Sequence, residues 1–144
     1  MDELLIVGDV KAGGHHRWTH ADLDSAPTSA RVDDLSKVLP GRRGRGVLFR
    51  WLVEQALPEQ NVRWACLESL DGSFAASLEV ADLKDAVIVH ADDDGALGAD
   101  RGGPYRLFIP GASDACGNIK QLGRVTLGEG PERDTRPPVS ERSC

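Results

Sequence analysis

The spacing of hydrophobic residues along the chain changes from helical to alternating. In VLFRWLVEQAL, residues 47–57, apolar side chains recur three and four positions apart, which predicts an amphipathic helix that ends before Pro58. In NVRWACLES, residues 61–69, apolar and polar positions alternate, which predicts a half-buried strand with Cys66 on its apolar face. Short apolar runs bounded by turn residues predict further strands at residues 3–10, 31–33, 74–80, 87–91, 104–110 and 124–127.

Local cap and turn signals complete the predicted architecture. Thr19, followed three residues later by Asp22, predicts the start of a short helix in THADLDS. LDGS, residues 70–73, predicts the turn of a hairpin, and ADLKDA, residues 81–86, predicts a single helical turn. Strands outnumber helices and do not alternate with them regularly. The expected fold class is therefore α+β, a mixed, mainly β domain with short helices.

Composition and charge narrow the class of protein. The 144 residues are 40% hydrophobic and 28% charged, which fits one globular domain, expected at residues 1–127. Residues 128–144 lack apolar periodicity and are expected to form a disordered C-terminal tail. No apolar run approaches the roughly 20 residues of a membrane span, and the acidic start does not look like a secretory signal. A cytoplasmic protein with no membrane partner is expected, and the net charge of −6 argues against a nucleic-acid partner.

Cysteines and histidines offer little sign of a metal site. The chain has three cysteines and no CxxC pair, which favours free thiols in a reducing compartment over disulfides or structural zinc. His16 and His20 are four residues apart, but a helix that begins only at Thr19 would not place them on one face. No metal-ligating set and no catalytic residue are therefore expected, with a histidine metal site in this segment as the alternative.

The segment GGPYRLFIPGASDACGNIK, residues 102–120, carries the strongest candidate binding chemistry. Strand alternation turns Arg106 away from the aliphatic side of its strand. Glycines at both ends of the following loop leave backbone N–H groups available to an anion, and Lys120 adds a positive charge beyond the loop. The alternatives are a surface turn with a solvated lysine, or a loop in which Cys116 acts as a nucleophile, for which no histidine base is evident.

The order of motifs resembles the sulfite oxidase-type molybdopterin-binding domain family. SLDGSFAASLEV matches the hairpin of that family, GGPYRLFIPG matches its GGPxRLxxPG strand, and NIKQLGRVTL matches the segment that leads to its last strand. RGVLFRWLVEQALP and LLIVGDV are similar to its upstream segments, so the resemblance spans roughly residues 3–127.

The resemblance implies a cofactor and the residues that hold it. Arg106 and Lys120 match family positions whose side chains help hold the pterin cofactor, molybdopterin. The backbone of the loop before the lysine would cradle its terminal phosphate. The cofactor-binding residues expected on this basis are Arg106, Gly111, Cys116, Gly117, Asn118 and Lys120.

The chain departs from the family at the metal. Family enzymes carry a molybdenum-binding cysteine about a dozen residues before the glycine that matches Gly46, and here that position falls near Asp34. The sequence thus predicts a divergent, non-catalytic domain that binds a pterin-like or other phosphorylated ligand, or a protein partner. The alternatives are a molybdenum-dependent oxidoreductase with unusual coordination by Asp34 or Cys116, and a hydrolase that uses Cys116 with His90, His15 or His16.

Overall fold

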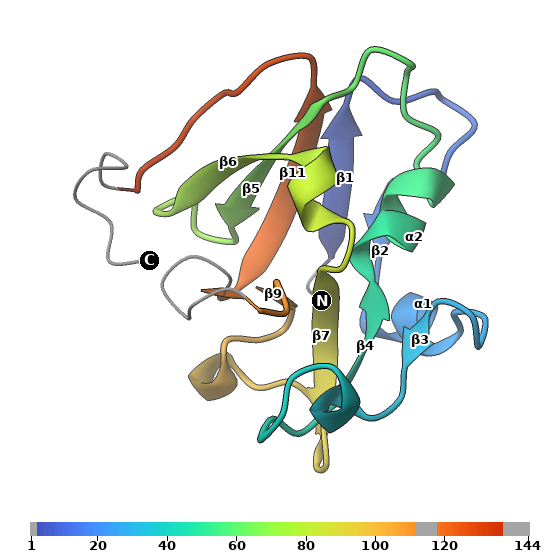
Figure 1. Ribbon diagram of the computed structural model, residues 1–144, viewed down its shortest axis with the longest axis vertical. Helices are drawn as coiled ribbons and strands as arrows, with labels where there is room; N and C mark the ends of the chain where they lie inside the picture. The colour runs from blue at the N-terminus through green and yellow to red at the C-terminus, as the bar shows by residue number, and fades with distance from the viewer. Residues whose placement is uncertain (1–2, 112–117, 137–144) are drawn as a thin grey trace.

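The computed structural model describes residues 3–111 and 118–136 and contains two β-sheets that share a hydrophobic core (Figure 1). In the first sheet β1 and β11 pair in parallel and the other neighbours pair antiparallel. Its strands, in spatial order, are β2 (Arg17–Trp18), β1 (Leu4–Gly8), β11 (Leu122–Gly128), β5 (Trp64–Ser69) and β6 (Ala75–Glu79).

The second sheet is antiparallel and carries the candidate site. Its strands, in spatial order, are β10 (Asn118–Ile119), β9 (Arg106–Phe108), β7 (Val87–Asp92), β4 (Arg45–Leu48) and β3 (Arg31–Val32), with β8 (Gly95–Ala96) paired to β7. The expected α+β, mainly β fold is confirmed.

Short helices connect the strands: α1 (His20–Asp24), η1 (Leu35–Lys37), α2 (Phe49–Gln55), η2 (Val80–Leu83) and η3 (Ala99–Arg101). The predicted cap of α1 is present, because the Asp22 N–H donates to Thr19 Oγ1 at 3.2 Å and the Thr19 N–H donates to Asp22 Oδ2 at 2.9 Å. None of the described helices has the length and apolar character that crossing a membrane requires.

Strand β7 is buried on both faces. Ile88 packs into the main core between the sheets, whereas Val87 and Val89 belong to a second, smaller cluster with Phe108. Because both sides of this strand are packed, the side chains that it carries are held rigidly. The candidate functional groups described below lie around it.

The helix predicted at residues 47–57 begins later than the sequence indicates. Val47 and Leu48 extend β4, where Val47 pairs with Ile88 and the Leu48 N–H donates to the carbonyl of Ala30. A short apolar run is compatible with the spacing of a helix and with that of a strand. Here pairing with the backbone of β7 makes these two residues part of a strand. The helix α2 then spans Phe49–Gln55, and the sequence-based boundary was wrong by two residues at its start.

Cys66 is buried, but on the opposite face of β5 from the one expected. Ala65 and Leu67 fill the main core, whereas the Cys66 thiol points to the other side and donates to the carbonyl oxygen of Arg133 at 3.3 Å. The small side chain of alanine at position 65 gives little sign in the sequence that its face of the strand is the buried one. The core face was therefore assigned to the side that carries Cys66 and the larger apolar residues that alternate with it.

The chain after β11 covers that second face of the first sheet. The Thr135 N–H donates to the carbonyl oxygen of Ala75 in β6, and the Ala75 N–H donates to Thr135 Oγ1. Ser77 of the same strand donates through its hydroxyl to the Arg133 carbonyl. Asp134 accepts from the Ser77 N–H at 3.1 Å. Residues 132–136 thus differ from the disordered tail predicted from residue 128, because polar side chains of the segment complete the edge of the sheet. Residues 137–144 lie outside the described residues.

Candidate functional site

Two short paired strands bring together three of the predicted cofactor-binding residues. Leu107 of β9 and Ile119 of β10 are register partners, and both are buried in the core. Alternation therefore places Arg106, Asn118 and Lys120 on the opposite face. Arg106 Nε donates to Asn118 Oδ1 at 2.7 Å, which ties the two strands together and fixes the direction of the guanidinium group.

Gly102 allows the two cationic side chains to lie together. The helix η3 ends at this residue, whose φ of +87° lies in the left-handed region that favours glycine. A Cβ built at this position would lie 2.8 Å from Arg106 Cδ and 3.1 Å from Lys120 Cγ. The aliphatic stems of Arg106 and Lys120 thus both cross the bare backbone of Gly102, on one surface of the molecule.

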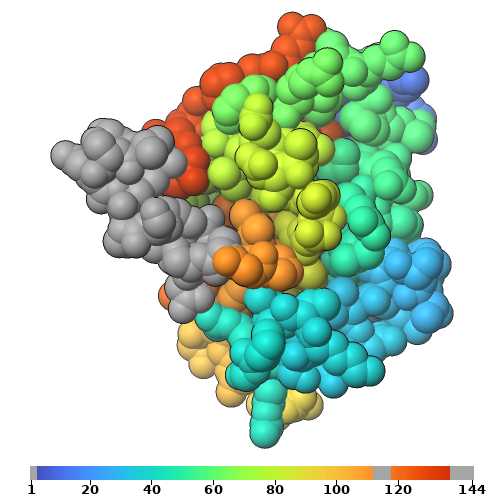
Figure 2. All heavy atoms as spheres, in the orientation of Figure 1, coloured from blue at the N-terminus to red at the C-terminus, as the bar shows by residue number. Residues whose placement is uncertain are grey.

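Phe108 adds an aromatic surface to this cationic group. The Cζ atoms of Arg106 and Arg42 lie 4.6 and 4.7 Å from the centre of the Phe108 ring, within the range of cation–π contacts. Arg42 comes from the loop between η1 and β4, far from β9 in the sequence. Figure 2 shows that loop (cyan) against the segment that contains β9 (orange) on the same face of the molecule.

The two arginines line an open hollow of about 550 Å³ beside the second sheet. Its charged lining consists of Arg42, Arg43, Arg101, Arg106, Asp92 and Asp100. Arg101 pairs with the buried Asp92 at 3.2 Å and Arg43 pairs with Asp93 at 3.3 Å, so two of the four positive charges are neutralised locally. The guanidinium groups still outnumber the carboxylates, and the hollow is therefore suited to an anion.

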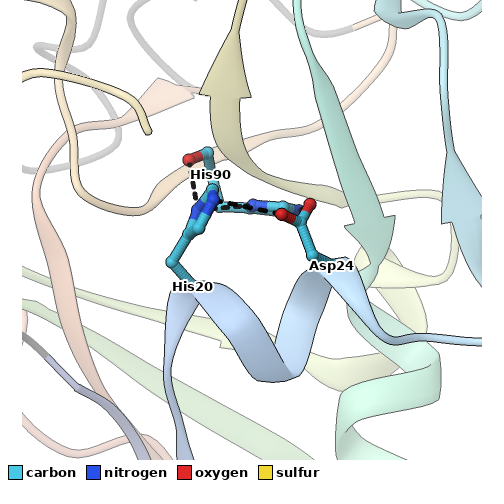
Figure 3. Close-up of side chains that lie close together, drawn as sticks. All are labelled: His20, Asp24 and His90. Atoms are coloured by element: carbon cyan, nitrogen blue, oxygen red, sulfur yellow. Dashed lines mark hydrogen bonds and ion pairs between the residues drawn. The ribbon is translucent and has the colours of Figure 1, made fainter. Parts of the chain in front are cut away.

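A second group of polar side chains lies between α1 and β7 (Figure 3). His20 and Asp24 are one turn apart on α1, and His20 Nε2 lies 3.2 Å from Asp24 Oδ2. His90 of β7 points toward both, with its Nδ1 3.1 Å from His20 Nδ1 and its Nε2 3.9 Å from Asp24 Oδ1. Arg45 of β4 donates to both carboxylate oxygens of Asp24, at 3.2 and 3.3 Å.

Burial and charge set the protonation of this second group. Burial, with the nearby charge of His20, lowers the pKa of His90 from 6.5 to about 4, so its ring is neutral at pH 7. The hydrogen bonds from Arg45 lower the pKa of Asp24, whose carboxyl is therefore ionised. A neutral imidazole, a carboxylate and a second imidazole then face one another, and such a set can hold a proton or a metal ion.

The remaining predicted site residues fall in different places. Gly111 ends the described part of the loop with a φ of +85°, and apart from its chain neighbours no atom of the described residues lies within 4 Å of a Cβ at that position. Cys116 and Gly117 lie outside the described residues. The cofactor contacts expected from them therefore stay predictions.

The position expected for a metal-binding cysteine has a structural use instead. Asp34 caps the start of η1, where its Oδ1 accepts from the Ser36 N–H at 3.0 Å and the Ser36 hydroxyl at 2.6 Å. These bonds lower the pKa of the carboxyl. Among the described residues no cysteine lines the hollow, and Cys66 lies in the other sheet with a thiol pKa that burial raises.

Two features of the site escaped the sequence analysis. The pairing of Phe108 with Arg42 joins a loop and a strand that are remote in the sequence, although GRRGRG did mark a basic loop. The grouping of His20, Asp24 and His90 had one local signal, the spacing of four residues between His20 and Asp24 on a capped helix.

Comparisons with known proteins agree with this fold. The oxidoreductase molybdopterin binding domain, as a family, matches residues 42–135. Among solved structures, the sulfane dehydrogenase SoxCD from Paracoccus pantotrophus superimposes with a TM-score of 0.68 at 20% sequence identity, over 90% of this chain. The chain spans 39% of the length of that protein. The comparison with curated protein sequences found no match. The family match covers more than half of the chain, which therefore belongs to the oxidoreductase molybdopterin binding domain family.

Proposed function

We propose that this chain is a non-catalytic member of its family that binds a pterin-like or other phosphorylated ligand in the hollow beside Phe108. The observation that carries the proposal is the convergence of Arg106 and Lys120 over Gly102. A guanidinium and an ammonium on one surface supply charge-assisted hydrogen bonds to phosphate oxygens. Asn118 holds the guanidinium in place before the ligand arrives, which lowers the entropic cost of binding.

The side chains of the hollow fit the phosphate and the pterin of a molybdopterin, but they do not fit its metal-binding end. The arginines of the hollow suit a phosphate. The guanidinium groups of Arg42 and Arg106, which lie against the buried Phe108 ring, are planar groups on which a planar ring system can stack. Molybdenum in this family is bound by a thiolate, a soft ligand. Asp34, a hard carboxylate that already caps η1, does not replace it. Bound in the hollow, the pterin would supply redox chemistry only together with a metal.

The two catalytic alternatives receive less support from the described residues. Coordination by Asp34 would replace the soft thiolate with a hard carboxylate, one oxygen of which, Oδ1, already accepts both hydrogen bonds from Ser36. A hydrolase based on Cys116 would need a histidine base, and His90 is buried in contact with His20 and Asp24. His15 stacks on Trp18, with ring centroids 3.7 Å apart. No observation favours either alternative as a second proposal.

The first test is the cofactor content of the protein after expression in a host that makes molybdenum cofactor. Elemental analysis measures molybdenum, and fluorescence after oxidative release measures pterin. Pterin without metal is the expected result. Near-stoichiometric amounts of both would contradict the non-catalytic assignment, because the metal would then be held without the family thiolate. If no pterin is found, pterin is excluded as the ligand. A binding measurement with inorganic pyrophosphate then tests whether the hollow binds a phosphorylated ligand at all.

Substitution of the two converging cations is expected to weaken anion binding. We expect Arg106→Ala and Lys120→Ala each to raise the Kd for inorganic pyrophosphate about 10- to 100-fold, because each removes charge-assisted hydrogen bonds of about 1.5–3 kcal/mol. Titration calorimetry measures the Kd. Arg50→Ala on α2 and Lys84→Ala after η2 change the net charge equally, and neither residue lines the hollow or is among the side chains nearest to Gly102. Equal weakening by these controls would reduce the proposal to a general charge effect.

A further inference from the structure

We infer that His20, Asp24 and His90 form a binding site for one divalent transition-metal ion of the zinc class. The site lies where α1 meets β7 (Figure 3) and shares no residue with the lining of the cationic hollow. It does not depend on the function proposed above. The sequence predicts no metal-ligating set, because its cysteines and histidines lack paired ligand spacing and His16 and His20 do not share a helix face.

The three ligands are carried by elements that fix their positions. The capping interactions of Thr19 set the start of α1, so His20 and Asp24 occupy equivalent places on successive turns. His90 lies on β7, which is packed on both faces, and only 2% of its side chain is exposed. A site on such rigid elements is organised before the ion arrives, which favours binding.

The ligand atoms are already close to coordination distances. One donor atom from each residue can be chosen so that all three lie within 4.8 Å of one another. Ligands about 2.1 Å from a tetrahedral zinc ion are roughly 3.4 Å apart. The separation of 3.2 Å between His20 Nε2 and Asp24 Oδ2 is close to that value. His90 Nε2 lies 3.9 Å from the other carboxylate oxygen, Oδ1, so the His90 ring must move inward to place a nitrogen on the same ion.

The hydrogen bonds of His20 point to a cation at this place. His20 Nδ1 lies 3.2 Å from the carbonyl oxygen of His90, which can only accept, and 3.1 Å from His90 Nδ1. The tautomer of His20 with the proton on Nδ1 satisfies the carbonyl oxygen. The other nitrogen, Nε2, then directs its lone pair at the ionised carboxylate of Asp24. Two lone pairs at this distance repel unless a positive charge lies between them, either a proton on His20 or a metal ion. A histidine that donates Nδ1–H to a backbone carbonyl is the usual arrangement for ligation through Nε2.

The surroundings select the class of ion. Arg45 holds both oxygens of Asp24, as supporting groups around metal sites do, and its charge offsets the carboxylate. Two imidazoles with a neutralised carboxylate suit zinc-like ions better than calcium or magnesium, which prefer several oxygen ligands. The His20 and Asp24 side chains are 36% and 38% exposed, which gives an ion access and leaves room for a water ligand.

Metal titration of untagged, chelator-treated protein tests the site. Co²⁺ is added while visible absorption is followed, and Zn²⁺ is then used to displace it. We expect one ion per chain and d–d bands of a four- or five-coordinate site. His20→Ala and Asp24→Asn are each expected to raise the Kd at least about tenfold, the loss caused by removing even a supporting residue. Both positions are half-exposed, so these variants should fold, which circular dichroism verifies.

The controls separate this site from other donors. His16→Ala removes a histidine that contacts the Ala56 carbonyl, and it should leave the cobalt affinity unchanged. A substitution of Cys116 and Cys144 by serine should also leave the visible spectrum unchanged. The inference is overturned if no ion binds, if His20→Ala binds as tightly as the wild type, or if the bands depend on the cysteines. Pyrophosphate binding by His20→Ala should be that of the wild type, so this test and that of the anion site fail separately.

Discussion

Replacement of Gly103 by alanine is expected to destabilise the protein by about 3 kcal/mol or more, as overpacking against rigid backbone does. A Cβ on Gly103 would overlap the carbonyl group of Leu97 and lie 2.9 Å from the carbonyl oxygen of Gly98. That oxygen also accepts from the Gly103 N–H at 2.9 Å, so the backbone cannot move away without losing a hydrogen bond. Urea unfolding monitored by tryptophan fluorescence measures the change.

The same substitution should also weaken anion binding. Gly103 lies next to Gly102, over which Arg106 and Lys120 converge, and a shift of this backbone would separate the two cations. Gly13→Ala is the matched control, because its Cβ would lie 4.0 Å from Leu57 Cδ1, an ordinary contact, and we expect a change within about 0.5 kcal/mol. If Gly103→Ala unfolds at the same urea concentration as Gly13→Ala, the expected clash between the new Cβ and the Leu97 carbonyl is contradicted.

The parts of the fold that the sequence predicted are those with a local physical cause. The Thr19 and Asp22 pair specifies the start of α1 through two hydrogen bonds within four residues. Asp71 specifies the turn between β5 and β6, where its carboxylate accepts from the Ser73 N–H and from the hydroxyls of Ser69 and Ser73. These interactions form wherever their residues occur together, so a pattern of sequence is sufficient to find them.

The parts that the sequence missed depend on contacts between distant segments. Val47 and Leu48 have apolar spacing that suits a helix, and β7 decided in favour of a strand. Cys66 was placed on the wrong face because the covering segment at Arg133 lies 67 residues further along the chain. A hydrophobic pattern records that a residue is buried, but it does not record which element buries it.

The same difference between local signals and contacts of distant segments explains which residues of the candidate sites the sequence predicted. Arg106 and Lys120 were selected because both lie in one glycine-rich segment and match cofactor-binding positions of the family that this segment resembles. The approach of His90 to His20 joins residues 70 apart, and nothing local to either residue signals it. The resemblance to a known family identified the fold and supports the proposed anion site. It gave no indication of the histidine pair, which has no counterpart among the motifs that carry the resemblance.

His90 is expected to dominate the loss of stability in mild acid. Its pKa is about 4 in the folded protein and 6.5 when exposed, so the unfolded chain binds the proton first as the pH falls. The stabilisation is therefore fully present above pH 6.5 and is lost progressively down to about pH 4. A difference of this size corresponds to a loss on the order of 3 kcal/mol. The free energy of unfolding in urea, measured from pH 8 to 4 with a chelator present, should fall across this window.

The pH range of this loss distinguishes the contribution of His90 from that of acidic residues, which titrate at lower pH. Asp71 and Asp134, whose hydrogen bonds lower their pKa values to about 2, lose their contribution only as the pH falls from about 4 towards 2. His90→Gln should flatten the pH dependence between 6.5 and 4 whatever its effect on absolute stability, since the slope reports only the difference in bound protons. If the pH dependence of the unfolding free energy has the same slope in His90→Gln as in the wild type, another group takes up the proton. The assignment of a neutral His90 ring facing Asp24 and Arg45 would then be wrong.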